Sequence, residues 1–269
     1  MCVTLSPANL TNTIVYAHRM ANGQHVMGYQ NKASSPVQWG VPAFNAMILP
    51  IPAKGDMGQE NAVDLRSDPD ILKDYAKATN DEDSLSRGMK VRGAAAMLNS
   101  VSVFKTGSYE VVMAKQPRLI PSVVKELHPE IKVGEELMEA YGRWYRGWHV
   151  AVCFFSGTVE AEPIMFTYEP KFPNFLFAPT LDAHTGGVPA SWAELDHTIV
   201  FGSGDNGNKV HRPHPTPSTL TPYFPSHVKG FKPPSRVLNG DYWFPIEHPT
   251  DNQWTENVVR RLPAGMTPS

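Results

Sequence analysis

The stretch TIVYAHRMANGQHVMGYQ (13–30) decides the expected fold class. Two runs rich in β-branched and aromatic residues, 13–19 and 24–30, flank the dipeptide Asn22-Gly23. Asn-Gly accepts a positive φ angle at little cost, so two such runs around it predict a β-hairpin. The early part of the chain is therefore expected to consist of antiparallel strands.

A second strand signal lies in NAMILPIP (45–52), which is a continuous apolar run. A run of this length predicts a strand that is covered on both faces. Because Pro50 and Pro52 have no N–H to donate to a sheet, this strand is expected to end there or to lie at a sheet edge. Two further apolar runs, VAVCFFSG (150–157) and EPIMFTYEP (162–170), are expected to form another pair of strands.

Helices are expected in three segments. DPDILKDYAKATNDEDS (68–84) has Pro69 at its first turn and a narrow apolar stripe. IPSVVKELHP (120–129) is bounded by prolines. GEELMEAYGRWYRGWH (134–149) repeats apolar residues with a period close to 3.6, which is typical of an amphipathic helix that packs on a core.

The pattern predicts an α+β protein dominated by β-structure, with a mostly antiparallel sheet, two or three flanking helices and a proline-rich C-terminal arm. Residues 1–204 are expected to form a β-rich globular domain with a helical insertion at about 56–98. Sixteen of the 25 prolines lie after residue 162. Because this part is also rich in aromatic residues, we expect 205–269 to be a stiff arm packed on the body or on a partner.

Composition argues against several classes of function. The formal net charge is −2, with 24 basic and 26 acidic residues, so no nucleic-acid partner is expected. No apolar run is long enough for a membrane span, and no secretory signal is recognisable, so we expect a cytoplasmic protein. The two cysteines, Cys2 and Cys153, exclude a disulfide framework, while leaving open whether they pair with each other.

Cys2 directly follows Met1 and offers one catalytic hypothesis. Removal of Met1 would place an α-amino group beside the thiol, where the amine acts as general base and the thiol as nucleophile. The opening resembles the N-terminal-nucleophile hydrolases of the bile-salt and penicillin amidase kind, which begin Met-Cys and carry an arginine at the end of the second strand; Arg19 occupies that position here. The resemblance implies hydrolysis of amide bonds, and Asn206 is the candidate oxyanion donor.

Histidine and carboxylate residues offer a second hypothesis. LDAHTGG contains Asp182 and His184, and ELDHTIVFG contains Asp196 and His197. Imidazole and carboxylate groups together suit Zn, Fe or Mn, and the four residues would make a metal site if their two loops meet. The cofactor is otherwise unknown, with a divalent metal (Zn or Fe) as the candidate.

A third hypothesis needs no special residue. Aromatic residues on stiff backbone, as in YFP (223–225), FKPP (231–234) and YWFP (242–245), bury well against another surface at low entropic cost. A binding role for these segments accounts for the enrichment of the later part of the chain in proline and aromatic residues. We therefore expect first a non-catalytic binding or assembly protein, with a protein partner or a homo-oligomer, ahead of the hydrolase and the metal-dependent enzyme.

Overall fold

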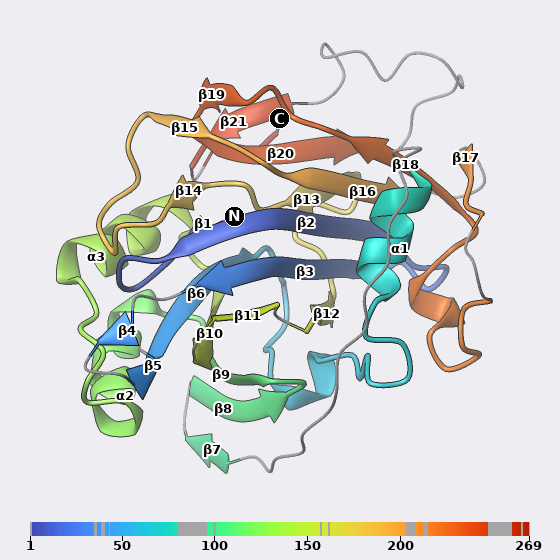
Figure 1. Ribbon diagram of the computed structural model, residues 1–269. Helices are drawn as coiled ribbons and strands as arrows, with labels where there is room; N and C mark the ends of the chain where they lie inside the picture. Colours follow the sequence, from blue (N-terminus) through green and yellow to red (C-terminus); the bar gives the residue numbers. More distant parts are fainter. Residues whose placement is uncertain are drawn as a thin grey trace.

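The computed structural model is dominated by β-strands, most of them antiparallel, with three α-helices among the described residues (Figure 1). The predicted fold class is therefore confirmed. The structure describes residues 2–34, 37–38, 41–42, 44–79, 96–98, 101–156, 158–160, 162–202, 208–211, 215–246, 260–264 and 266–268.

The predicted hairpin is formed by β2 (Asn9–Arg19) and β3 (His25–Ser34), which pair antiparallel. The turn contains Gly23 at φ +84°, a conformation that glycine adopts without strain. β2 begins earlier than the apolar run predicts, because a bulge near Asn12, at φ +53°, lets the ladder continue past it.

This hairpin lies within a seven-stranded sheet. β2 also pairs parallel with β16 (Thr198–Gly202), so a strand from late in the chain extends the hairpin. On the other side, β3 pairs with both β11 (Thr158–Glu160) and β12 (Ile164–Tyr168). The sheet is completed by β18 (His227–Phe231) and β17 (Asn208–Lys209).

Both faces of the seven-stranded sheet are covered. Successive residues of a strand point to opposite faces. Val15 and Ala17 of β2 accordingly enter the main core, while Tyr16 enters a smaller cluster beneath α1 (Ile71–Ala78). Gly28 of β3 lies on the same face, where a Cβ would be 3.1 Å from the Met165 side chain and 3.2 Å from that of Tyr16. The missing side chain thus leaves room for these residues of the two neighbouring strands.

A five-stranded antiparallel sheet forms the other wall of the main core. Its order is β6-β10-β9-β8-β7, so β6 lies at one edge, as the prolines of 45–52 predict. All residues of β6 except Phe44 are buried, which confirms the expected cover on both faces. The strands are β6 (Phe44–Ile51), β10 (His149–Ser156), β9 (Tyr109–Ala114), β8 (Val101–Thr106) and β7 (Ala96–Leu98).

The expected pairing of 150–157 with 162–170 is wrong. The first run forms β10, which pairs with β6 and β9, whereas the second forms β12, which pairs with β3 in the other sheet. Each strand is buried and pairs with strands from other parts of the chain. Proximity in sequence therefore does not decide the pairing here.

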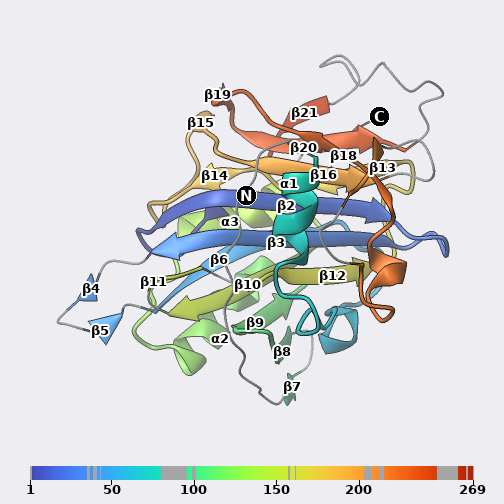
Figure 2. The ribbon, with the colours of Figure 1, turned by 45° about the vertical axis from the view of Figure 1, so that its right-hand side comes forward.

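The three helices cover two sides of the sheets. α1 lies over β2, β3 and β16, and α3 (Glu135–Trp144) lies behind them (Figure 2). α2 (Ile120–Leu127) packs with α3 against the core through buried Ile120 and Val124. α3 stops at Trp144, earlier than its periodicity predicts, although Tyr145 and Trp148 are still buried beyond its end.

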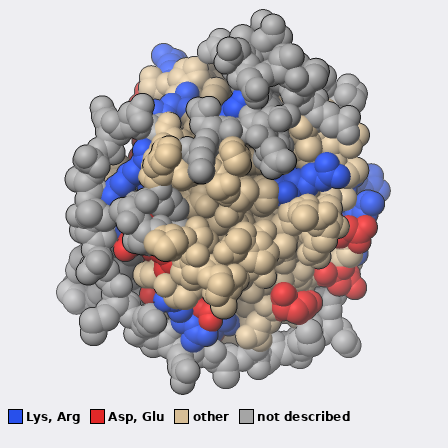
Figure 3. Space-filling model, turned by 90° about the vertical axis from the view of Figure 1, so that its right-hand side faces the viewer, with Lys and Arg blue, Asp and Glu red and all other residues tan. Residues whose placement is uncertain are grey.

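The proline-rich segment 215–226 contains no charged residue. Leu220 and Phe224 are buried in the cluster under α1, and the Tyr16 hydroxyl donates to the Tyr223 carbonyl at 2.8 Å. η3 (Thr221–Tyr223) lies in this segment. The side of the molecule that carries α1 and η3 is largely free of charge at its centre, with charged side chains toward its margins (Figure 3).

Residues after 204 also contribute strands to the sheets. β18 lies beside β16 in the seven-stranded sheet, and the boundary at residue 204 stays a prediction. A three-stranded sheet joins β13, β20 and β21. Three small two-stranded sheets, with two or three residues in each strand, complete the described β-structure. The bounds are β13 (Phe175–Ala178), β20 (Gly240–Pro245), β21 (Arg260–Pro263), β1 (Cys2–Val3) with β14 (Asp182–Ala183), β4 (Val37–Gln38) with β5 (Val41–Pro42), and β15 (Trp192–Glu194) with β19 (Arg236–Leu238); η1 (Gln59–Asn61) and η2 (Pro117–Leu119) are short 3₁₀ turns.

Candidate functional site

A two-stranded antiparallel ribbon, β15 with β19, carries two large hydrophobic side chains that are exposed at the surface. Its register places Trp192 opposite Leu238 and Glu194 opposite Arg236. Directly opposite residues share one face of a β-ladder. The four side chains therefore form one outward face, which we call the ribbon face, while the middle pair of the ladder is buried beneath it.

The ribbon face exposes an apolar pair. Trp192 is 58% exposed and Leu238 is 45% exposed, although both are large hydrophobic residues. Single exposed hydrophobic residues are common on any surface, but two that are directly opposite each other form a contiguous apolar spot. The Arg236 guanidinium lies 5.9 Å from the centre of the Trp192 ring, within the range of a cation–π contact.

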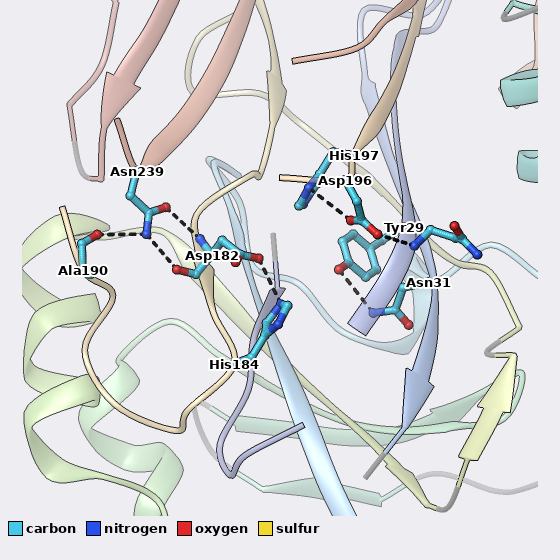
Figure 4. Close-up of polar contacts among 9 residues, drawn as sticks. Tyr29, Asn31, Asp182, His184, Ala190, Asp196, His197 and Asn239 are labelled. Atoms are coloured by element: carbon cyan, nitrogen blue, oxygen red, sulfur yellow. Dashed lines mark hydrogen bonds and ion pairs between the residues drawn. The ribbon is translucent and has the colours of Figure 1, made fainter. Parts of the chain in front are cut away.

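The ribbon is held rigidly by the buried side chain of Asn239, which follows β19. Its amide nitrogen donates to the carbonyls of Asp182 at 2.7 Å and Ala190 at 2.9 Å, and its amide oxygen accepts from Asp182 N at 2.9 Å (Figure 4). The Leu195 N–H donates to the Ser235 carbonyl at 2.7 Å beyond the other end of the ladder. Both ends of the ribbon are thus fastened, and a pre-ordered surface loses little entropy on binding.

The two charged residues of the ribbon face are not paired with each other in the structure. No ion pair joins Glu194 to Arg236, even though they are opposite in the ladder, and Arg236 is turned toward Trp192 instead. Both are exposed. By backbone position the face therefore has Trp192 and Leu238 at one end and Glu194 and Arg236 at the other, and the Arg236 guanidinium reaches back over the indole ring.

The structure locates Cys2 only by its backbone, which pairs with Asp182 in the β1–β14 ladder. The Cys2 side chain and Asn206 lie outside the described residues, so the hydrolase hypothesis stays a prediction. The other cysteine, Cys153, is free and fully buried, and burial raises the pKa of its thiol. Cys153 therefore makes no disulfide with Cys2, and it has neither the access nor the thiolate character of a nucleophile.

The structure places Arg19 at the opposite end of β2 from Ala8. Arg19 ends β2 and pairs with His25 at the hairpin turn. Ala8 precedes β2, and its backbone N–H donates to the carbonyl of His184 at 3.0 Å, close to the β1–β14 ladder. A strand of this length spans roughly 30 Å, so Arg19 lies far along the sheet from the Ala8–His184 contact.

The predicted metal ligands form two separate pairs. His184 Nε2 lies 3.1 Å from Asp182 Oδ1, and His197 Nδ1 lies 3.9 Å from Asp196 Oδ1 (Figure 4). Burial lowers the pKa of His197 well below its usual value. In the part of the chain that the structure describes, no three His, Cys, Asp or Glu side chains gather as a metal would require. The local pairing of Asp182 with His184 does follow from their spacing.

Trp192, Arg236 and Leu238 are not among the residues that the sequence singles out. Strands of three residues are too short for a period of two to be recognisable. A lone tryptophan in SWAEL (191–195) is equally compatible with a core residue. Only the pairing of two segments more than 40 residues apart places Trp192 beside Leu238.

No family model matches the sequence, and a comparison with curated proteins finds no match. Among solved structures, the chain is similar to the crystal structure of baculovirus P35, with a TM-score of 0.47 and 15% identity over 91% of each chain. It is also similar to a structure of the caspase-8/P35 complex, with a TM-score of 0.42 and 13% identity over 94% of this chain and 91% of that one.

Within the described residues, no helix combines the length and the apolar character that are needed to span a bilayer.

Proposed function

We propose that this protein acts by binding another protein chain, and that the ribbon face is the centre of its binding surface. The observation that carries the proposal is the exposed Trp192–Leu238 pair with Arg236 beside the indole ring. Tryptophan and arginine are the residue types that most often dominate the energy of protein–protein interfaces. An exposed pair of this kind is costly in water and is stabilised when a partner covers it.

The surroundings of the ribbon support the same function. Hot-spot residues contribute most when they are held in place before the partner arrives. The bonds of Asn239 to Asp182 and Ala190 keep the ribbon in one conformation.

The test is an affinity capture in which tagged wild-type protein and a Trp192→Ala variant are used as baits from the same lysate. A partner that binds the wild type and is lost with the variant is then purified, and its affinity is measured by titration calorimetry. Caspase-8, the partner named in one of the solved structures above, is included as a purified probe.

The matched control is Leu127→Ala, which removes a 38% exposed leucine at the end of α2, away from the ribbon (Figure 1). We expect Trp192→Ala to weaken binding at least about tenfold, a loss typical of a hot-spot residue, and Leu127→Ala to leave it within about twofold. Equal losses in both variants, or no partner and no self-association of the wild type, would contradict the proposal.

A further inference from the structure

We infer that the chain which covers the ribbon face is a second copy of this protein, bound about a two-fold axis parallel to the strands of the ribbon. This inference rests on the proposed function and names its partner. It comes from the arrangement of the four side chains of the ribbon face, which is its own complement under one symmetry operation only.

The four side chains stand at the corners of a rectangle. Opposite residues of a ladder are about 5 Å apart, and alternate residues along a strand are about 7 Å apart. Trp192 and Leu238 share one short side, and Glu194 and Arg236 share the other. The rectangle therefore has an apolar end and a charged end.

Two copies placed face to face can be related by a two-fold axis along the strands or across them. An axis along the strands puts Trp192 of each copy on Leu238 of the other, and Glu194 on Arg236 of the other. An axis across the strands puts Trp192 over Glu194 and Leu238 over Arg236, which buries charges against apolar groups. Only the first arrangement matches every side chain, and such isologous contacts are the usual basis of homodimers.

The Glu194 carboxylate is available for this contact, and the Arg236 guanidinium reaches it by turning from the Trp192 ring toward the second copy. Glu194 forms no ion pair with Arg236 within its own chain, and both are exposed. In the proposed dimer each carboxylate meets a guanidinium of the second copy, so the interface contains two ion pairs related by symmetry. Charge complementarity of this kind fixes register and excludes the alternative orientation.

The experiment is sedimentation equilibrium of the full chain over a range of concentrations. We expect the wild type to dimerise reversibly, and the single reversals Glu194→Arg and Arg236→Glu each to weaken dimerisation at least about tenfold, because each places like charges opposite one another twice. The double reversal restores the complement and should return the dissociation constant to within about threefold of the wild type.

A mixture gives the sharpest readout. A chain with Glu194→Arg carries two arginines on its ribbon face, and a chain with Arg236→Glu carries two glutamates. Each alone should dimerise at least about tenfold more weakly than the wild type, whereas an equimolar mixture should form a heterodimer about as tightly as the wild type dimerises. Circular dichroism of each variant confirms that it is folded.

A wild type that stays monomeric at the highest concentration tested overturns the inference, and so does a dimer whose affinity is insensitive to the charge reversals. Both results leave the proposed function open to its own test, since a different partner can still depend on Trp192. If the capture finds such a partner and no self-association, the ribbon face binds a different protein.

Discussion

The hydroxyl of Tyr145 donates a 2.6 Å hydrogen bond to Oδ2 of the fully buried Asp241, close behind the ribbon. The other carboxylate oxygen accepts the N–H groups of Thr180 at 2.9 Å and Leu181 at 3.2 Å. Burial raises the pKa of Asp241, and these three donors act in the opposite direction. One carboxylate thus joins the end of α3, the chain after β13 and the beginning of β20.

The Asp241 network predicts two graded losses of stability. Asp241→Ala leaves three buried donors without an acceptor, so the free energy of unfolding should fall by about 3 to 5 kcal/mol. Tyr145→Phe removes only one donor and should cost about 1 to 2 kcal/mol. Urea unfolding followed by tryptophan fluorescence measures both. If the two variants lose equal stability, Asp241 does not hold these elements together.

Phe224 anchors the proline-rich segment 215–226 and is 2% exposed. Phe224→Ala should destabilise the protein by about 3 to 5 kcal/mol, because it opens a cavity among Tyr16, Tyr75 and the sheet. Thr219→Ala, at an exposed position of the same segment, is the control and should change stability by less than about 0.5 kcal/mol. Limited proteolysis should cut the segment faster in the first variant only; equal cutting in both would argue against the anchor.

Gly240 begins β20 and is paired with Pro263 of β21. A Cβ at this position would overlap the carbonyl oxygen of Leu262, so Gly240→Ala should displace β21. We expect faster amide exchange over 260–262 and a loss of about 1 to 3 kcal/mol in the free energy of unfolding. Gly55→Ala, where a Cβ would meet nothing within 4 Å, is the control and should leave exchange in this strand unchanged. Unchanged exchange in both variants would show that the close contact between residue 240 and the Leu262 carbonyl does not determine the position of β21.

Two buried histidines make stability depend on pH. Burial, followed by the Arg19 charge for His25 and the Lys115 charge for His149, lowers each pKa from 6.5 to about 4. Between these values the unfolded chain binds more protons than the folded one, so stability is complete above about pH 6.5 and falls as the pH decreases toward 4.

The loss should reach up to about 3 kcal/mol per histidine over this range. His149→Gln should flatten the dependence of the urea midpoint on pH, whereas His211→Gln, at an exposed position, should not. Parallel pH profiles for the wild type and His149→Gln would refute the assignment.

Local features of the fold were predictable from the sequence, and long-range pairings were not. Asn22-Gly23 between two β-prone runs predicts the hairpin, because turn chemistry acts within a few residues. The run 45–52 predicts a strand buried on both faces, because its continuous apolar composition is likewise a property of a few neighbouring residues. The partners of β10 and β12 could not be predicted, because pairing depends on packing with segments distant in sequence.

In the candidate site, too, local contacts were predictable from the sequence and long-range pairings were not. Asp182 and His184 are two residues apart, and their contact follows from that spacing. The ribbon face joins residues 192–194 to 236–238, and no pattern within either segment indicates the other. Exposure is also a tertiary property: Trp192 lies on the outer face only because its neighbour Ala193 faces the core.

The parallel pairing of β2 with β16 has a consequence for the order of events on the ribosome. The neighbour of β2 emerges about 180 residues after β2 itself, and β14, the partner of β1, emerges 180 residues after β1. Until then, one side of the nascent hairpin is an open edge able to recruit other chains. Such distant pairings slow folding, so translation speed and chaperone supply should govern the yield of folded protein in the cell.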